Sequence, residues 1–222
     1  MKVAPDHSVV HLVRHGEVFN PTGVLYGRLP DFHLSDNGRA MADRLGEWFA
    51  ETPLTALRCS PLERARETLA PIAAAHPHLE VSLDERVLEA ANDFEGQVFG
   101  AGNQALKRPA NWWKLRNPLR PSWGEPFTQV RDRMVNAIAD AALAAGEGGE
   151  AVIVSHQLPI WIARLDAEGR RLVHDPRKRQ CNVASVTSLH LQKNRIVRVT
   201  YAEPAGDLVK AKDRGKSFSS GS

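Results

Sequence analysis

Short apolar runs alternate along the chain with longer segments in which apolar residues recur every three or four positions. The first run, residues 9–13, is rich in β-branched side chains and is followed by Gly16, which predicts a buried strand that ends in a loop. The next segment predicts a helix that is capped by Ser35 and ends near Glu51. The apolar face of this helix comprises Met41, Leu45, Trp48 and Phe49.

The same order of strand and helix recurs. Residues 55–58 predict a second strand, and Ser60 with Glu63 has the pattern of a capping box that places Pro61 at the first helical position. The remaining predicted elements are a strand at 79–83, a helix at 127–145, a strand at 151–155, a helix at 158–167, and two strands at 184–191 and 196–201 that form a hairpin through Lys193 and Asn194.

Strands that alternate with helices favour a mostly parallel sheet covered on both faces, so the predicted fold class is α/β, a three-layer α/β/α sandwich. We expect one domain over residues 1–208. Residues 92–125, which hold three tryptophans and a cluster of cations, interrupt the alternation and are interpreted as an inserted lid over the sheet edge and the active site. Residues 209–222, dominated by Lys, Gly and Ser, predict a disordered tail.

Composition narrows the class of protein. The 222 residues are 42% hydrophobic and 25% charged, which excludes wholesale disorder. The net charge of +3, from 29 basic and 26 acidic residues, is too balanced for a dedicated nucleic-acid binder. The two cysteines have no spacing typical of a zinc site or a disulfide framework. The N-terminal apolar stretch is too short and too charged for a signal peptide, so we expect a soluble cytoplasmic protein.

Candidate chemistry lies where predicted strands end. His15 and His156 each follow a strand, and ligands of open α/β sheets bind outside the carboxyl ends of the strands. Arg14 precedes His15, and Arg64 lies in the first turn of a helix, where the free amides attract anions and the side chain is expected to be exposed. Guanidinium groups suit phosphate oxygens. Each residue taken alone also fits a hydrogen-bonded loop histidine or a solvated arginine.

Three motifs in order resemble the histidine phosphatase superfamily, the group that includes phosphoglycerate mutases. They are RHGE at 14–17, SPLERARET at 60–68 and VSHQ at 154–157. The resemblance extends from about Val9 to Leu191 and implies a phosphoglycerate mutase-like fold. It also implies that His15 is the nucleophile that becomes phosphorylated.

The resemblance implies roles for further residues. Arg14 and Arg64 would hold the phosphoryl group, joined by His156. Flanking guanidinium groups lower the pKa of an imidazole and keep it neutral and nucleophilic, which agrees with these roles. Whether His156 acts as a cation or as a neutral hydrogen-bond donor stays open.

A general acid must protonate the leaving oxygen. Family members place a glutamate after the third strand, and Glu89 matches it, with Asp93 and Glu95 as alternatives. The substrate-binding positions that the resemblance implies are Asn20, Gly27 and Gln157. His7 and His11 share a four-residue spacing with His15, but no carboxylate or cysteine completes a site, so we expect no metal and no cofactor.

Two basic segments remain. Residues 107–120 carry five cations interleaved with Trp112 and Trp113, which fits either a lid that recognises an anionic substrate or an insertion anchored by its tryptophans. No nucleic-acid-binding motif accompanies them, so a nucleic-acid partner is not expected. Residues 170–181 predict a solvated loop, with the alternative that they extend the rim of the substrate cleft.

The predicted function is a metal-independent phosphomonoesterase, a hydrolase that acts on a small-molecule phosphate monoester through a phosphohistidine at His15. A phosphoglycerate mutase-like phosphotransferase shares every core residue and is the first alternative. A phosphatase is favoured because the insertion does not resemble the segments of the mutases. A non-catalytic phosphate-binding module is the second alternative. The oligomeric state stays open, with a homodimer among the options.

Overall fold

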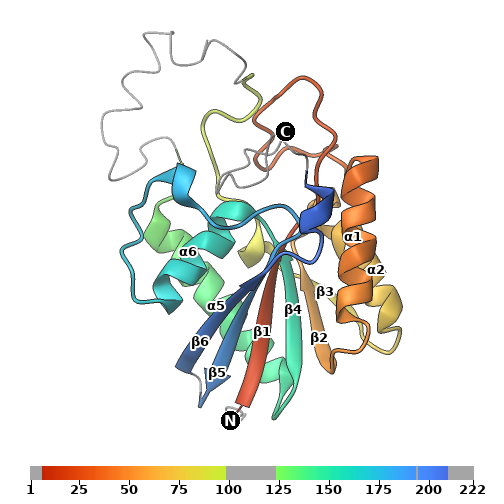
Figure 1. Cartoon of the computed structure of the whole chain (residues 1–222). Helices are drawn as coiled ribbons and strands as arrows, with labels where there is room; N and C mark the ends of the chain where they lie inside the picture. The colour runs from red at the N-terminus through yellow and green to blue at the C-terminus, as the bar shows by residue number, and fades with distance from the viewer. Residues whose placement is uncertain (1–6, 99–123, 194, 210–222) are drawn as a thin grey trace.

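The structure is a computed structural model that describes residues 7–98, 124–193 and 195–209. Its centre is a mixed six-stranded sheet in the order β3-β2-β4-β1-β5-β6 (Figure 1). The strands are β1 (His7–Arg14), β2 (Leu54–Cys59), β3 (Val81–Leu83), β4 (Glu150–Ser155), β5 (Val186–Gln192) and β6 (Arg195–Ala202). The first four run parallel, and β5 and β6 are antiparallel to their neighbours. The predicted fold class, a mostly parallel sheet between helical layers, is confirmed.

Two pairs of helices cover the two faces of the sheet (Figure 1). The helices are α1 (Asp36–Phe49), α2 (Glu63–Ala75), α5 (Phe127–Ala145) and α6 (Gln157–Ala167), with short 3-10 turns η1 (Glu85–Val87), η2 (Pro176–Lys178) and η3 (Gly206–Leu208). In these described parts of the chain no helix is long and apolar enough to cross a membrane. The described elements agree with the predicted ones to within about two residues, the usual uncertainty of a helix or strand end.

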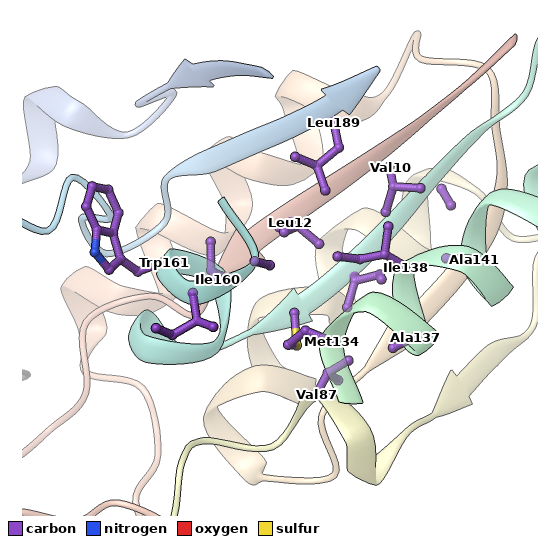
Figure 2. Packing of buried hydrophobic residues seen from close by; sticks show 14 of the residues in the cluster. Val10, Leu12, Val87, Met134, Ala137, Ile138, Ala141, Ile160, Trp161 and Leu189 are labelled. Atoms are coloured by element: carbon purple, nitrogen blue, oxygen red, sulfur yellow. The ribbon is translucent and has the colours of Figure 1, made fainter. Parts of the chain in front are cut away.

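Alternation along β1 divides the core between the two faces. Val10 and Leu12 point toward α5 and α6, where they meet Met134, Ile138 and Ile160 (Figure 2). Val13 packs on the other face in a second cluster with residues of α1 and α2. Because both faces of β1 are covered, its apolar residues Val9, Val10, Leu12 and Val13 lie on both sides of the strand, and only His11 interrupts the run.

The beginning of α1 is as the sequence predicts. Ser35 is its N-cap, and the Ser35 hydroxyl accepts a hydrogen bond from the backbone N–H of Gly38 at 3.0 Å. Trp48, expected on the apolar face, is instead 54% exposed, whereas Phe49 is fully buried. Met41, Leu45 and Phe49 follow one another at four-residue spacing on the buried face, and Trp48, about 100° from Phe49 around the helix, points away from the centre of that face.

The predicted capping box at α2 is wrong. The helix begins at Glu63 with Leu62 as N-cap, no side chain caps it, and Pro61 lies before it. The Ser60 hydroxyl lies instead 2.8 Å from Nε2 of His156. A contact made by the tertiary fold has therefore replaced the local one.

The predicted domain boundaries stay a prediction. Most of the expected insertion at 92–125 and of the expected tail at 209–222 lies outside the described residues. At the edges of these segments Asn92 bridges to Gly124, and Val209 packs in the cluster against α1 and α2.

Candidate active site

Two histidines meet where β1 and β4 end. The strands pair in parallel with Arg14 opposite Ser155, and the backbone N–H of His15 donates to the carbonyl of Ser155 at 3.1 Å. This register brings the rings of His15 and His156 to a centroid distance of 5.2 Å, and both side chains are buried. The carboxyl ends of adjacent parallel strands thus bring the two predicted histidines together.

His15 has the protonation state that a nucleophile requires. Its Nδ1 lies 2.8 Å from the carbonyl oxygen of Gly16, which can only accept, so Nδ1 carries the hydrogen and Nε2 has the lone pair in the neutral ring. Burial holds the pKa of His15 well below its ordinary value, and the charges of Arg64 and Arg14 add to this. The neutral imidazole is therefore the dominant form at neutral pH.

A tight backbone turn follows His15. The N–H of Gly16 donates to the Thr68 hydroxyl at 3.0 Å, and a Cβ on Gly16 would lie only 2.6 Å from the carbonyl oxygen of Gly38. Glycine is therefore needed here for the close approach of the loop to the start of α1. The Thr68 hydroxyl in turn donates to the carbonyl of Arg64 at 2.7 Å, which ties α2 to the histidine loop.

Arg64 is fully buried, at 0% exposure, which corrects the expectation of an exposed arginine. One of its nitrogens, Nη2, donates to the carbonyl of Gly27 at 2.5 Å, and its guanidinium lies 4.8 Å from the centre of the Tyr26 ring. Its Nε and Nη1 are buried and have no hydrogen-bond partner in the described part of the chain. Two unused donors on a buried cation favour the binding of an anion.

Arg14 is anchored beside the same histidine. It ends β1, is buried, and its Nη1 donates to the carbonyl of Cys181 at 2.7 Å. The same carbonyl accepts from Nε2 of Gln157 at 3.4 Å. Gln157 begins α6, so the predicted residues of the first and third motifs share one acceptor.

His156 completes the cluster with one free ring nitrogen. Nε2 lies 2.8 Å from the Ser60 hydroxyl, and Nδ1 is buried without a partner among the residues that the structure covers. Burial lowers the pKa of His156 well below its ordinary value, with the charge of Arg64 as the second cause. When Ser60 donates to Nε2, Nδ1 carries the hydrogen, so a neutral His156 can donate a hydrogen bond at this site.

Glu89 is the carboxylate that reaches the cluster. It is partly buried after η1, and its Oε1 accepts from the N–H of Ala90 at 2.9 Å. The Glu89 carboxylate is within electrostatic reach of Tyr26 and Arg64. Of the alternatives, Asp93 is exposed, and Glu95 packs on Gly27 and accepts from the N–H of Asn92 at 3.3 Å. Glu89, which is within electrostatic reach of Arg64, is therefore the candidate for a general acid.

Asn20 and Gly27 shape the loop after the first motif. The Asn20 amide makes reciprocal hydrogen bonds with the backbone of Val24, at 2.9 and 3.1 Å. Gly27 has φ +42°, and a Cβ there would lie 2.2 Å from Oε1 of Glu95. Because the Gly27 carbonyl holds Arg64, these residues organise the site, and their contact with substrate stays a prediction.

Sequence reasoning gave Ser60 only the role of a helix cap and assigned no role to Thr68 and Tyr26. The first two lie within the second motif, four residues before and after Arg64, so a search for helix positions facing Arg64 could have identified Thr68. No local signal marks Tyr26. Cys59 and Cys181 are free and buried, and no group of three potential metal ligands occurs in the described ranges.

Sequence comparison relates the chain to known proteins. Residues 10–204 match the family model described as the histidine phosphatase superfamily, branch 1. "Uncharacterized protein Rv0525" of Mycobacterium tuberculosis is 52% identical over 201 residues, which cover 90% of this chain and 98% of that protein. "Phosphoglycerate mutase-like protein 4" of Arabidopsis thaliana is 31% identical over 159 residues, covering 68% and 67%.

Solved structures share the fold. The native structure of mycobacterial glucosyl-3-phosphoglycerate phosphatase Rv2419c superposes with a TM-score of 0.69 at 22% identity, over 88% of this chain and 96% of that one. At such identity the likeness concerns the fold. The family match, by contrast, covers most of the sequence and includes the motifs that carry His15, Arg64 and His156. The chain belongs to the histidine phosphatase superfamily.

Proposed function

We propose that this protein is a phosphomonoesterase that hydrolyses a phosphate monoester through a covalent phosphohistidine at His15. One observation carries the proposal: a neutral imidazole with its Nε2 lone pair available lies beside two buried guanidinium groups. Arg64 there has donors without partners in the described residues. A nucleophile and an anion site are the two things that phosphoryl transfer requires of a protein.

The first step transfers the phosphoryl group to the protein. Nε2 of His15 attacks phosphorus, an N–P bond forms, and the bond from phosphorus to the ester oxygen breaks. Protonated Glu89 gives its proton to the departing oxygen, which leaves as an alcohol. Arg14, Arg64 and Nδ1–H of His156 stabilise the charge on the phosphoryl oxygens.

The second step regenerates the enzyme. The Glu89 carboxylate takes a proton from water, the water oxygen attacks phosphorus, and the N–P bond breaks to release inorganic phosphate and neutral His15. The same residue thus serves as acid and then as base. Apart from substrate and water, the groups named in this cycle are side chains of this protein.

A phosphoglycerate mutase-like phosphotransferase is the first alternative, supported by the Arabidopsis relative that bears a mutase-like name. Such an enzyme would return the phosphoryl group to a second hydroxyl instead of to water. A non-catalytic phosphate-binding module is the second alternative. It has no need of a neutral nucleophile, because a protonated imidazole binds an anion better.

The test is phosphate release from a panel of phosphorylated metabolites and nitrophenyl phosphate with a chelator present. The wild type is compared with His15→Ala. We expect turnover that withstands the chelator and disappears in the variant. Turnover that persists in His15→Ala would refute the role of His15. No turnover unless a phosphoryl donor and phosphoglycerate are supplied together would favour the mutase.

A further inference from the structure

A third arginine lies beside the site on the segment between α6 and β5. Arg179 is partly buried and comes two residues before Cys181, whose carbonyl binds Arg14 and Gln157. It is within electrostatic reach of Glu89 and Arg14. Glu89 is therefore within electrostatic reach of two guanidinium groups, those of Arg64 and Arg179.

Arg179 is held by a neutral histidine. Its Nε donates to Nε2 of His174 at 2.8 Å. Nδ1 of His174 lies 2.7 Å from the carbonyl oxygen of Leu172, so Nδ1 carries the hydrogen and Nε2 is free to accept. Burial lowers the pKa of His174, which favours this neutral form.

His174 itself is fixed by aromatic contacts. Its ring centre lies 5.4 Å from that of Phe127 and 6.0 Å from that of Trp161, the latter edge-on. Phe127 begins α5 and Trp161 lies in α6, so the His174 ring packs against two helices of the core. The arginine that it holds is correspondingly preorganised.

Among the described residues, Arg179 lacks the carboxylate partner that Arg177 and Arg164 have. Arg177 pairs with Asp175 at 2.8 Å, and Arg164 pairs with Glu168 at 2.8 Å. In the residues that the structure describes, no carboxylate lies within ion-pair distance of Arg179. Burial lowers its pKa to about 10, so it remains charged at neutral pH. A partly buried cation with no carboxylate within ion-pair distance favours a ligand that supplies one.

We propose that Arg179, positioned by His174, binds a second anionic group of the substrate. This inference rests on the proposed phosphatase function. Arg14 and Arg64 hold the phosphoryl group, and Arg179 then selects monoesters that carry a further carboxylate or phosphate near the ester oxygen. A guanidinium whose Nε is occupied still has its Nη donors for the oxygens of either group.

The test compares substrates that differ only in the second anion. The ratio of kcat/KM for 3-phosphoglycerate over glycerol 3-phosphate measures recognition of a carboxylate. The ratio for fructose 1,6-bisphosphate over fructose 6-phosphate measures recognition of a second phosphate. We expect Arg179→Gln to lower at least one ratio by about 10- to 100-fold, the effect of removing a charge-assisted hydrogen bond.

Matched variants separate recognition from general charge and from folding. Arg177→Gln removes a charge from the same segment at a residue that is 84% exposed and paired with Asp175, and it should leave both ratios unchanged. His174→Phe, which removes the acceptor, should lower the same ratio as Arg179→Gln, whereas His174→Gln, which keeps one, should restore much of it. Ratios that stay within about twofold in Arg179→Gln, or that fall equally in Arg177→Gln, would overturn the proposal.

Measurements of substrate binding test the role of Arg179 independently of catalysis. In the full-length His15→Ala chain, calorimetry measures the dissociation constants of the same substrate pairs with and without Arg179→Gln. If Arg179→Gln loses this discrimination, the anion site is supported even when the wild type hydrolyses none of the substrates. Absence of hydrolysis by the wild type would refute only the proposed phosphatase function. Equal discrimination in both chains would refute the role of Arg179.

Discussion

The hydroxyl of Ser60 lies 2.8 Å from Nε2 of His156, and both residues are fully buried. This contact fixes the ring orientation of His156 and, when Ser60 donates, leaves the Nδ1 hydrogen for the phosphoryl group of the proposed reaction. The helix N-terminus beside it goes without a side-chain cap as a result.

Replacing Ser60 tests this arrangement. Ser60→Ala should lower kcat/KM by about tenfold or more, because a misoriented donor acts on the transition state. It should also lower the free energy of unfolding by about 1–3 kcal/mol, since Nε2 of His156 loses its partner in a buried place. Ser60→Thr keeps the hydroxyl and should restore turnover. Loss of stability with unchanged kcat/KM would show that Ser60 is only structural.

We predict that Arg64 lowers the free energy of unfolding although it raises kcat/KM. Arg64→Met keeps much of the volume and removes a buried charge, so kcat/KM should fall by about 100-fold or more. The free energy of unfolding, measured with urea, should stay equal or increase, because an apolar residue avoids the desolvation of the guanidinium. Arg66→Met, at the exposed neighbour on the same helix, is the control for both readouts. A large loss of stability in Arg64→Met would contradict this account.

The pKa of His15 sets the acid limb of activity. Because burial and the two arginines lower this pKa, the neutral nucleophile persists below pH 6.5, and kcat/KM should decline only at more acidic pH. Arg64→Met removes one cause and leaves burial, so the pKa of His15 should rise partway toward its ordinary value. NMR titration of the His15 ring in both proteins measures this directly. An unchanged or lower pKa in the variant would be inconsistent with the charge effect.

Glu89 should matter most for poor leaving groups. Glu89→Gln cannot give a proton to the ester oxygen, so hydrolysis of alkyl phosphates should slow by about 10²- to 10⁴-fold. Nitrophenyl phosphate, whose leaving group needs little protonation, should slow much less. Asp93→Asn, at the exposed carboxylate nearby, should change neither rate. Equal slowing of both substrates in Glu89→Gln would assign the acid to another residue.

Local patterns in the sequence were sufficient for the elements but not for their tertiary contacts. The helix at 127–145 matches the structure at both ends, because its apolar face and the glycine after it are local signals. The predictions for Ser60 and Arg64 were wrong for the same reason. Ser60 was expected to cap the helix and Arg64 to be exposed, but Ser60 contacts His156 and Arg64 is fully buried. A helix start favours a capping serine and an exposed arginine, and only the approach of β4 and of the loop at Gly27 buries both.

The site shows the same division. Arg14, His15 and His156 follow from strand ends in sequence, because parallel strands bring their carboxyl ends together. Arg179 looked like one cation in a solvated run, since its partner His174 and the rings that hold His174 come from other parts of the fold. Such contacts leave no periodic trace in the sequence.

Trapping the covalent intermediate tests the central claim most directly. The wild type is mixed with a labelled phosphate monoester and quenched within one turnover in alkaline denaturant, which spares the acid-labile N–P bond. Mass spectrometry of the peptides then locates the phosphoryl group. The account predicts a phosphohistidine at His15 that is absent from His15→Ala and accumulates in Glu89→Gln with nitrophenyl phosphate. Turnover with no phosphoryl group on His15, or with one on another residue, would contradict it.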